Sequence, residues 1–178
     1  MAGSDMWPPC NVTKAALDAC VKGGLLRPIM DERALHWIVP PVNDTEPNRP
    51  LGYVVCFLSF LDWGFGMLSG RFVRALAHYY GVELHNFNPN SIMQEAVFVT
   101  VCLGYLGIPP QWYLWLLHFK AEMSSRNEGR EKRHLRAGSC MLQLWQSCSH
   151  SYILSIMPSS NRGQQNWWFY FRNDGGLL

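Results

Sequence analysis

The chain has 178 residues, of which 48% are hydrophobic and 13% aromatic, so it is long and apolar enough to bury a core. This composition excludes a wholly disordered protein. The formal net charge is only +2, so any affinity for a polyanion must come from a local cluster of basic residues.

The amino-terminal residues 1–9 have neither the basic region nor the apolar region of a secretory signal. We therefore expect an intracellular protein, nuclear or cytoplasmic, whose six cysteines are free thiols. Residues 96–119 carry no formal charge and are about as long as a membrane-spanning helix. Pro109 and Pro110 interrupt this stretch, and lipid cannot replace the backbone donors that they remove. Two shorter buried helices are expected there, and no membrane span.

The first predicted element is a short helix over residues 13–22, capped by Thr13 or Asn11 and ended by Gly23 and Gly24. Four prolines then fall within residues 40–50, which excludes a regular element and indicates a linker or an extended surface segment. Residues 1–50 are thus expected to hold one helix and a proline-rich linker.

The centre of the chain, residues 51–123, is predicted to be a helical core. Its first run, residues 52–62, is apolar nearly all round; the periodicity allows a buried strand or a buried helix, and the length favours a helix. Asn88 followed by Pro89 is typical of a helix start. Three further helices are predicted over residues 70–80, 91–105 and 110–123.

Beyond the helical core, residues 124–138 are polar and predict an exposed basic loop, and residues 139–178 contain short β-type segments. These predicted strands cover residues 140–145, 152–156 and 167–172. The expected fold is mainly α, with a central helical core and a small C-terminal antiparallel β-sheet laid on it, an α+β architecture.

Several blocks are similar to those of a known family. Residues 54–66, VVCFLSFLDWGFG, resemble its FxSFxERGFG block, although Asp62 and Trp63 stand where the family has Glu and Arg. The blocks ALAHYYGVELHNFNPNSI, AVFVTVCLGYLGIPP and WYLW follow in the family's order and spacing, and RAGSC and WFYFRNDGG resemble its later blocks. Over about residues 50–176 the chain thus resembles the plant "putative gypsy-type transposon" domain, found in retrotransposon and transposase-like proteins of grass genomes.

This resemblance implies an origin in a transposable element, and it supplies no catalytic residues and no cofactor. Family members usually continue beyond the last block into long charged regions, whereas this sequence stops at Leu178. The sequence therefore resembles a truncated or locally diverged copy.

Catalysis by an integrase would require carboxylates that gather metal ions. Asp62, Glu83 and Glu95 could converge for this purpose. The favoured alternative is that Asp62 and Glu83 are helix-end or turn residues and that Glu95 interacts with the dipole in the first turn of its helix. We therefore predict no catalytic residues and no enzyme.

Metal ligands are also conceivable, since Cys140, Cys148 and His150 are close in sequence, and His78 and His85 flank a helix end. The sequence has no Cys-x-x-Cys pair and no Cys-Cys-His-Cys knuckle. Packed or exposed side chains are the favoured interpretation, and no metal or cofactor is expected.

Two sets of residues are candidates for binding. Basic residues in and before the predicted loop could contact the phosphates of RNA or DNA, although a solvated loop of mixed charge is the favoured alternative; they are Lys120, Arg126, Arg130, Lys132, Arg133 and Arg136. Aromatic residues near the C-terminus could anchor a partner or stack on bases, although packing in the core is favoured; they are Trp167, Trp168 and Tyr170.

The predicted function is a retrotransposon-derived, non-catalytic domain that binds and self-associates, gag-like, with weak contact to nucleic acid. The alternative is a host-recruited regulatory or toxic small protein that acts through a host protein partner. An enzyme of the integrase or transposase type comes third.

Overall fold

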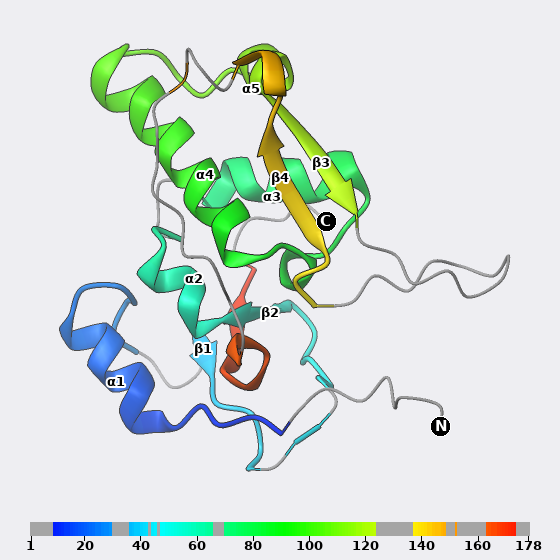
Figure 1. The fold of residues 1–178 in the computed structure, drawn as a ribbon. Coiled ribbons are helices and arrows are strands. Elements are labelled where there is room, and N and C mark those ends of the chain that lie inside the picture. The colour runs from blue at the N-terminus through cyan, green and yellow to red at the C-terminus, as the bar shows by residue number, and fades with distance from the viewer. Residues whose placement is uncertain are drawn as a thin grey trace, which may run out of the picture. The chain divides into compact units, whose positions relative to one another are not determined.

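The computed structural model contains helices and short strands, with four helices in succession in the middle of the described chain (Figure 1). It comprises two compact units, the first formed by residues 1–62 and 162–178 and the second by residues 63–161. The boundary after Asp62 falls inside the predicted helical core of residues 51–123. The structure describes residues 9–29, 36–42, 44–45, 47–65, 70–123, 137–148, 152 and 163–173.

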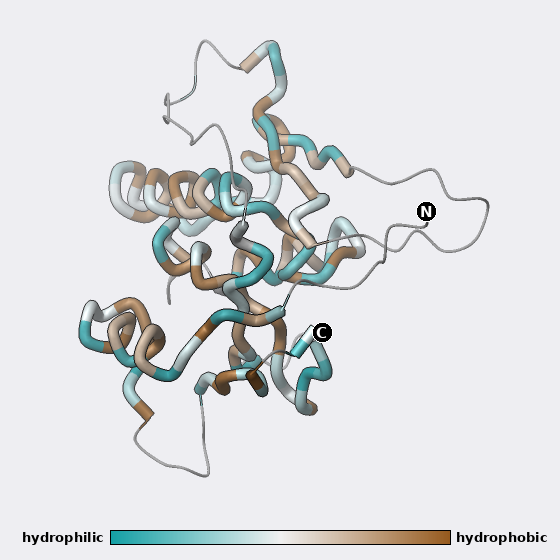
Figure 2. Tube along the Cα trace, turned by 60° about the horizontal axis from the view of Figure 1, so that its bottom comes forward, coloured by the Kyte–Doolittle hydropathy of each residue, from teal (hydrophilic) through white to brown (hydrophobic). Residues whose placement is uncertain are grey.

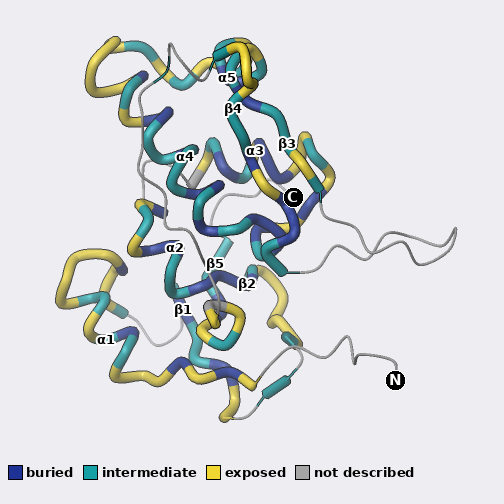
Figure 3. The backbone as a smooth tube through the Cα atoms, in the orientation of Figure 1, coloured by how far each residue is buried: buried dark blue, intermediate teal, exposed yellow. Residues whose placement is uncertain are grey.

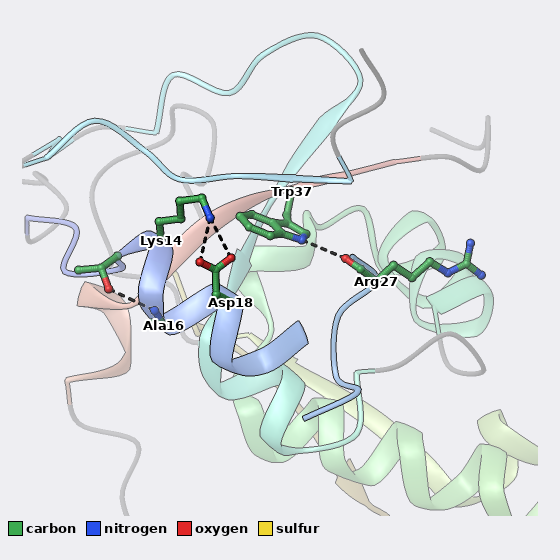
Figure 4. Close-up of polar contacts among 6 residues, drawn as sticks. Lys14, Ala16, Asp18, Arg27 and Trp37 are labelled. Atoms are coloured by element: carbon green, nitrogen blue, oxygen red, sulfur yellow. Dashed lines mark hydrogen bonds and ion pairs between the residues drawn. The ribbon is translucent and has the colours of Figure 1, made fainter. Parts of the chain in front are cut away.

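The first unit begins with α1 (Lys14–Lys22), which confirms the predicted helix. The Thr13 hydroxyl oxygen accepts a hydrogen bond from the Ala16 amide at 3.2 Å, so Thr13 rather than Asn11 is the cap. Lys14 and Asp18 form an exposed ion pair one turn apart, with 2.8 Å between the ammonium nitrogen and the nearer carboxylate oxygen (Figure 4). Such a pair contributes only a few tenths of a kcal/mol, roughly; the buried Leu17 anchors the helix.

A three-stranded antiparallel sheet forms the centre of the first unit. The strands are β1 (Trp37–Ile38), β2 (Tyr53–Phe57) and β5 (Trp168–Arg172), in the order β1-β5-β2. The register places Ile38 and Val55 opposite Tyr170 on the central strand. Trp37 is buried, and its indole donates to the Arg27 carbonyl oxygen at 3.2 Å (Figure 4). A short 3₁₀ turn, η4 (Gln164–Asn166), lies before β5, and another, η3 (Gln146–Cys148), belongs to the second unit.

Residues 52–62 do not form the single helix that was favoured. The run divides into β2 and the short helix α2 (Leu58–Asp62). Its first half is rich in β-branched and aromatic residues, and β5 supplies backbone partners from more than a hundred positions away along the chain. Length was a misleading criterion because two elements share one apolar run.

Helices dominate the second unit. They are α3 (Gly70–Tyr80), α4 (Pro89–Thr100) and α5 (Trp112–His118), with a 3₁₀ turn, η1 (Leu84–Asn86), between the first two. Asn88 caps α4 through a 2.8 Å bond from the Ser91 amide to its side-chain oxygen, as the sequence indicated. The helix continues into η2 (Val101–Tyr105), a π-helical turn in which the Leu106 amide donates to the Val101 carbonyl oxygen at 3.0 Å. Apolar and hydrophilic residues alternate along these helices (Figure 2).

The predicted last helix, residues 110–123, is wrong beyond His118. The backbone becomes extended at Phe119 and forms β3 (Phe119–Met123), which pairs antiparallel with β4 (Cys140–Leu144). The predicted C-terminal sheet is therefore divided, since β4 pairs in the second unit and β5 in the first. Of the predicted strand 152–156, only Tyr152 lies among the described residues. The fold is mixed α+β with two small antiparallel sheets.

An aromatic cluster fills the core of the second unit. Trp115 is completely buried and stacks on Phe119, with ring centroids 4.0 Å apart. Phe98 and Phe72 meet the same indole edge-on, at 5.2 and 5.6 Å. Figure 3 shows buried segments running through α3, α4 and β4. None of the described helices is both long enough and apolar enough to cross a membrane.

Replacing Gly64 with alanine is expected to destabilise the second unit by about 1–3 kcal/mol. Gly64 has φ of +91°, and a Cβ added there would lie 2.9 Å from the Cβ of Ala96. Urea unfolding should show a larger loss for Gly64→Ala than for Gly81→Ala, because Gly81 also has positive φ but a Cβ there meets open space. Equal losses in the two variants would contradict the steric argument.

Candidate binding surface

The helix α5 and the hairpin of β3 and β4 together present an exposed surface on the second unit. Trp145, just after β4, ties the hairpin to the helix: its amide donates to the His118 carbonyl oxygen at 2.8 Å, and its indole donates to the Leu116 carbonyl oxygen at 3.4 Å. His118 in turn donates from Nδ1 to the Leu114 carbonyl oxygen at 2.8 Å when that nitrogen carries the proton. The end of α5 and the end of β4 are thus held side by side (Figure 1).

Large apolar side chains are exposed on this surface. Tyr113 and Leu117 are 71% and 48% exposed and lie four residues apart on α5, with the buried Trp115 between them in sequence. Trp145 is 44% exposed. A second exposed apolar group occurs in and just after η2, where Tyr105 is 83% exposed. We call Tyr113, Leu117 and Trp145 the α5 patch.

Lys120 lies in β3 next to the α5 patch. Its ammonium group forms an ion pair with Glu122, two residues further along the strand, and lies 5.7 Å from the centroid of the Trp145 ring. Residues two apart on a strand share a face, so the strand itself brings these opposite charges together. A phosphate group at Lys120 would therefore compete with Glu122. The other predicted basic residues lie outside the described residues; they are Arg126, Arg130, Lys132, Arg133 and Arg136.

The predicted aromatic anchors occupy or adjoin β5 in the first unit. Trp168 is fully buried, and Tyr170 is also buried, so both pack in the core of that unit. Trp167 stands just before the strand and is 42% exposed. Because β5 is the central strand, both of its edges are paired, and its residues Trp168 and Tyr170 are buried, so the position before the strand is the accessible one.

The three carboxylates considered for metal-ion catalysis have separate surroundings. Asp62 is the last residue of α2 in the first unit, and Glu83 precedes η1 in the second, with 3.5 Å between its carboxylate and Nδ1 of His85. Glu95 is completely buried in the middle of α4. The prediction that Glu95 lies in the first turn is wrong, because α4 begins at Pro89, before the expected start.

The described residues include no group of three histidine, cysteine or acidic side chains placed to hold a metal ion. All six cysteines are described, and none is joined in a disulfide. Burial raises the pKa of the Cys10, Cys20, Cys56, Cys102 and Cys140 thiols, that of Cys140 to about 11. A catalytic thiol needs a lowered pKa, so these five resemble inert, packed cysteines.

Residues 55–123, from β2 through β3, match the model of a protein family described as "Putative gypsy type transposon". This part of the chain is similar to the gypsy-type transposon domain. This match confirms the resemblance deduced from the sequence blocks between Val55 and Met123. Neither a curated protein nor a solved structure matches the chain.

The matched residues contain two parts of the candidate surface, α5 and β3, whereas Trp145 lies beyond them. Tyr113 and Leu117 were not predicted as surface residues because they fall within the long buried helix predicted for residues 110–123, and Trp145 was not because it ends the strand predicted for residues 140–145. The spacing of these residues on a helix could have indicated their exposure. Trp115 faces the core, and Tyr113 and Leu117, two positions before and after it, lie on the other side of α5.

Proposed function

We propose that this gypsy-type domain is a non-catalytic binding domain that associates with copies of itself. The observation that carries the proposal is the α5 patch, in which Tyr113, Leu117 and Trp145 are all exposed beside an open β-hairpin. Exposed apolar clusters on a folded unit mark contact sites with other macromolecules, because burying them releases surface water.

The absence of catalysis is part of the proposal. The carboxylates Asp62, Glu83 and Glu95 differ in surroundings and belong to different elements, and the raised thiol pKa values argue against a cysteine nucleophile. Contact with RNA or DNA through the basic segment that includes Arg130, Lys132 and Arg133 remains a secondary part of the proposal. Such contacts would be weak, salt-dependent and indifferent to base sequence.

A second function, regulation through a single host protein, is favoured by Trp167. This exposed indole precedes a buried strand segment and would be a suitable anchor, since tryptophan is enriched at the centres of interfaces. It predicts a monomer that has one specific protein partner.

The proposed function predicts a defined oligomer in size-exclusion chromatography with light scattering of residues 1–178. Tyr113→Ala combined with Leu117→Ala should shift the population toward monomer, because the exposed apolar area is lost. Leu51→Ala is the matched control, because Leu51 is fully exposed in the first unit and outside the α5 patch.

Adding single-stranded RNA at low and high salt tests the secondary part of the proposal. A shift that disappears at high salt would support phosphate contact. A wild-type chain that is monomeric at every concentration, with and without RNA, would contradict self-association and favour the host-protein function.

A further inference from the structure

The hairpin of β3 and β4 has two outer edges. Residues of the same unit form hydrogen bonds to the edge of β4, and no described residue pairs with the middle of the edge of β3. The bond from the Trp145 amide to the His118 carbonyl oxygen fixes the alternation, because opposed residues in an antiparallel pair bond to each other at every second position. Lys120 and Glu122 therefore direct their backbone groups toward β4. Ala121 and Met123 direct theirs to the other side.

The outer edge of β4 is covered within the second unit. The Asn88 amide donates to the Cys140 carbonyl oxygen at 3.1 Å, and the Leu142 amide donates to the Ser91 hydroxyl oxygen at 2.8 Å. Both Cys140 and Leu142 are positions whose backbone groups face away from β3, so these bonds agree with the alternation.

The outer edge of β3 has no such cover from any described segment. The Phe119 amide donates to the Trp115 carbonyl oxygen at the end of α5. No described strand or side chain bonds to the outward amide and carbonyl of Ala121 or to the outward amide of Met123. An edge of this kind is a template for another strand.

The sequence of β3, FKAEM, is complementary to itself when reversed about Ala121. In an antiparallel pair of two β3 strands centred on this residue, Lys120 of each copy lies opposite Glu122 of the other, and Phe119 lies opposite Met123. The outward groups of the two Ala121 residues would bond to each other in both directions. Each Met123 amide would meet the Phe119 carbonyl oxygen of the other copy.

We propose that two copies of the chain join along β3, in antiparallel register about Ala121, to make a continuous four-stranded sheet of two hairpins. This inference rests on the proposed self-association and adds the edge of β3 to the α5 patch as a contact between copies. The charges of β3 favour a second copy of the same strand as its partner. A lone lysine on an edge strand repels other strands, but a second copy would place its Glu122 opposite Lys120.

Two single charge reversals test this register in the full chain by analytical ultracentrifugation. Lys120→Glu and Glu122→Lys each place like charges at both cross-strand positions, so each variant alone should self-associate at least tenfold more weakly than the wild type. An equimolar mixture of the two variants should recover a one-to-one heterodimer of wild-type affinity, because the opposite charges then face each other between chains.

The mixture separates contact between copies from the ion pair within one chain, since neither variant regains its own Lys120–Glu122 pair on mixing. Lys22→Glu is the control for Lys120→Glu, because it makes the same change in net charge on the exposed end of α1. Circular dichroism of each variant establishes that it is folded. Ala121→Pro, which removes only an outward amide from the hairpin, should also reduce self-association tenfold or more.

The outcomes distinguish the inference from the proposed function. Variants that self-associate as the wild type does, or a mixture that forms no heterodimer, would overturn pairing along β3 and leave self-association standing. A wild-type chain that is monomeric throughout would overturn both. Loss in each variant with recovery in the mixture would support both.

Discussion

Replacing Trp115 with alanine is expected to lower the free energy of unfolding of the second unit by about 3–5 kcal/mol. The indole is completely buried and in contact with three aromatic rings, those of Phe72, Phe98 and Phe119. These rings come from α3, α4 and β3, so the cavity would loosen the contact between three elements at once. Chemical denaturation followed by circular dichroism measures the loss.

Tyr113→Ala is the control for this prediction, because Tyr113 lies on the same helix but is mostly exposed. It should change the free energy of unfolding by no more than about 0.5 kcal/mol. Comparable losses in the two variants would mean that α5 as a whole, rather than the buried indole, determines stability.

Raising the pH from 9 to 11 is expected to destabilise the second unit by about 2 kcal/mol through Cys140 alone. Burial raises the pKa of this thiol from its ordinary value of 9.0 to about 11. Above pH 9 the unfolded chain loses the proton while the folded chain keeps it, so the equilibrium moves toward the unfolded state. The contribution is fully present below pH 9 and is lost as the pH rises through 11.

Unfolding experiments at several pH values should therefore show a smaller slope for Cys140→Ala than for the wild type in this interval. Tyr80 and Tyr152 belong to the same unit and titrate in the same direction, since burial raises the pKa of Tyr80 and raises that of Tyr152 to about 12. They should leave a residual slope in the variant. An unchanged slope would show that the Cys140 thiol is accessible to water.

Local chemistry made the helix starts predictable. Thr13 before α1 and Asn88 before α4 each accept a hydrogen bond from an amide three residues further along the chain, and the ring of Pro89 fixes a helical backbone angle at the first position of α4. The continuation of α4 to Tyr105 was predictable for the same reason, because the information lies within the segment itself.

The strands were harder to predict because their stabilising partners are distant. Nothing within residues 53–57 indicates that residues 168–172 will pair with them. The switch from helix to strand at Phe119 depends likewise on β4, which follows after more than fifteen residues. The alternation of Lys120 and Glu122 in the candidate surface has meaning only once β3 is known to be a strand, so a predicted helix concealed it.

The pairing of β2 with β5 also has a consequence for the order in which the chain can fold during synthesis. The second unit is continuous in sequence, so all its residues emerge from the ribosome before β5 does. The first unit has to wait, because β1 and β2 contact their shared partner only when residues 168–172 appear. Until then two strands rich in valine and aromatic residues lack their central neighbour, and a nascent chain stalled before residue 168 would expose edges that invite aggregation.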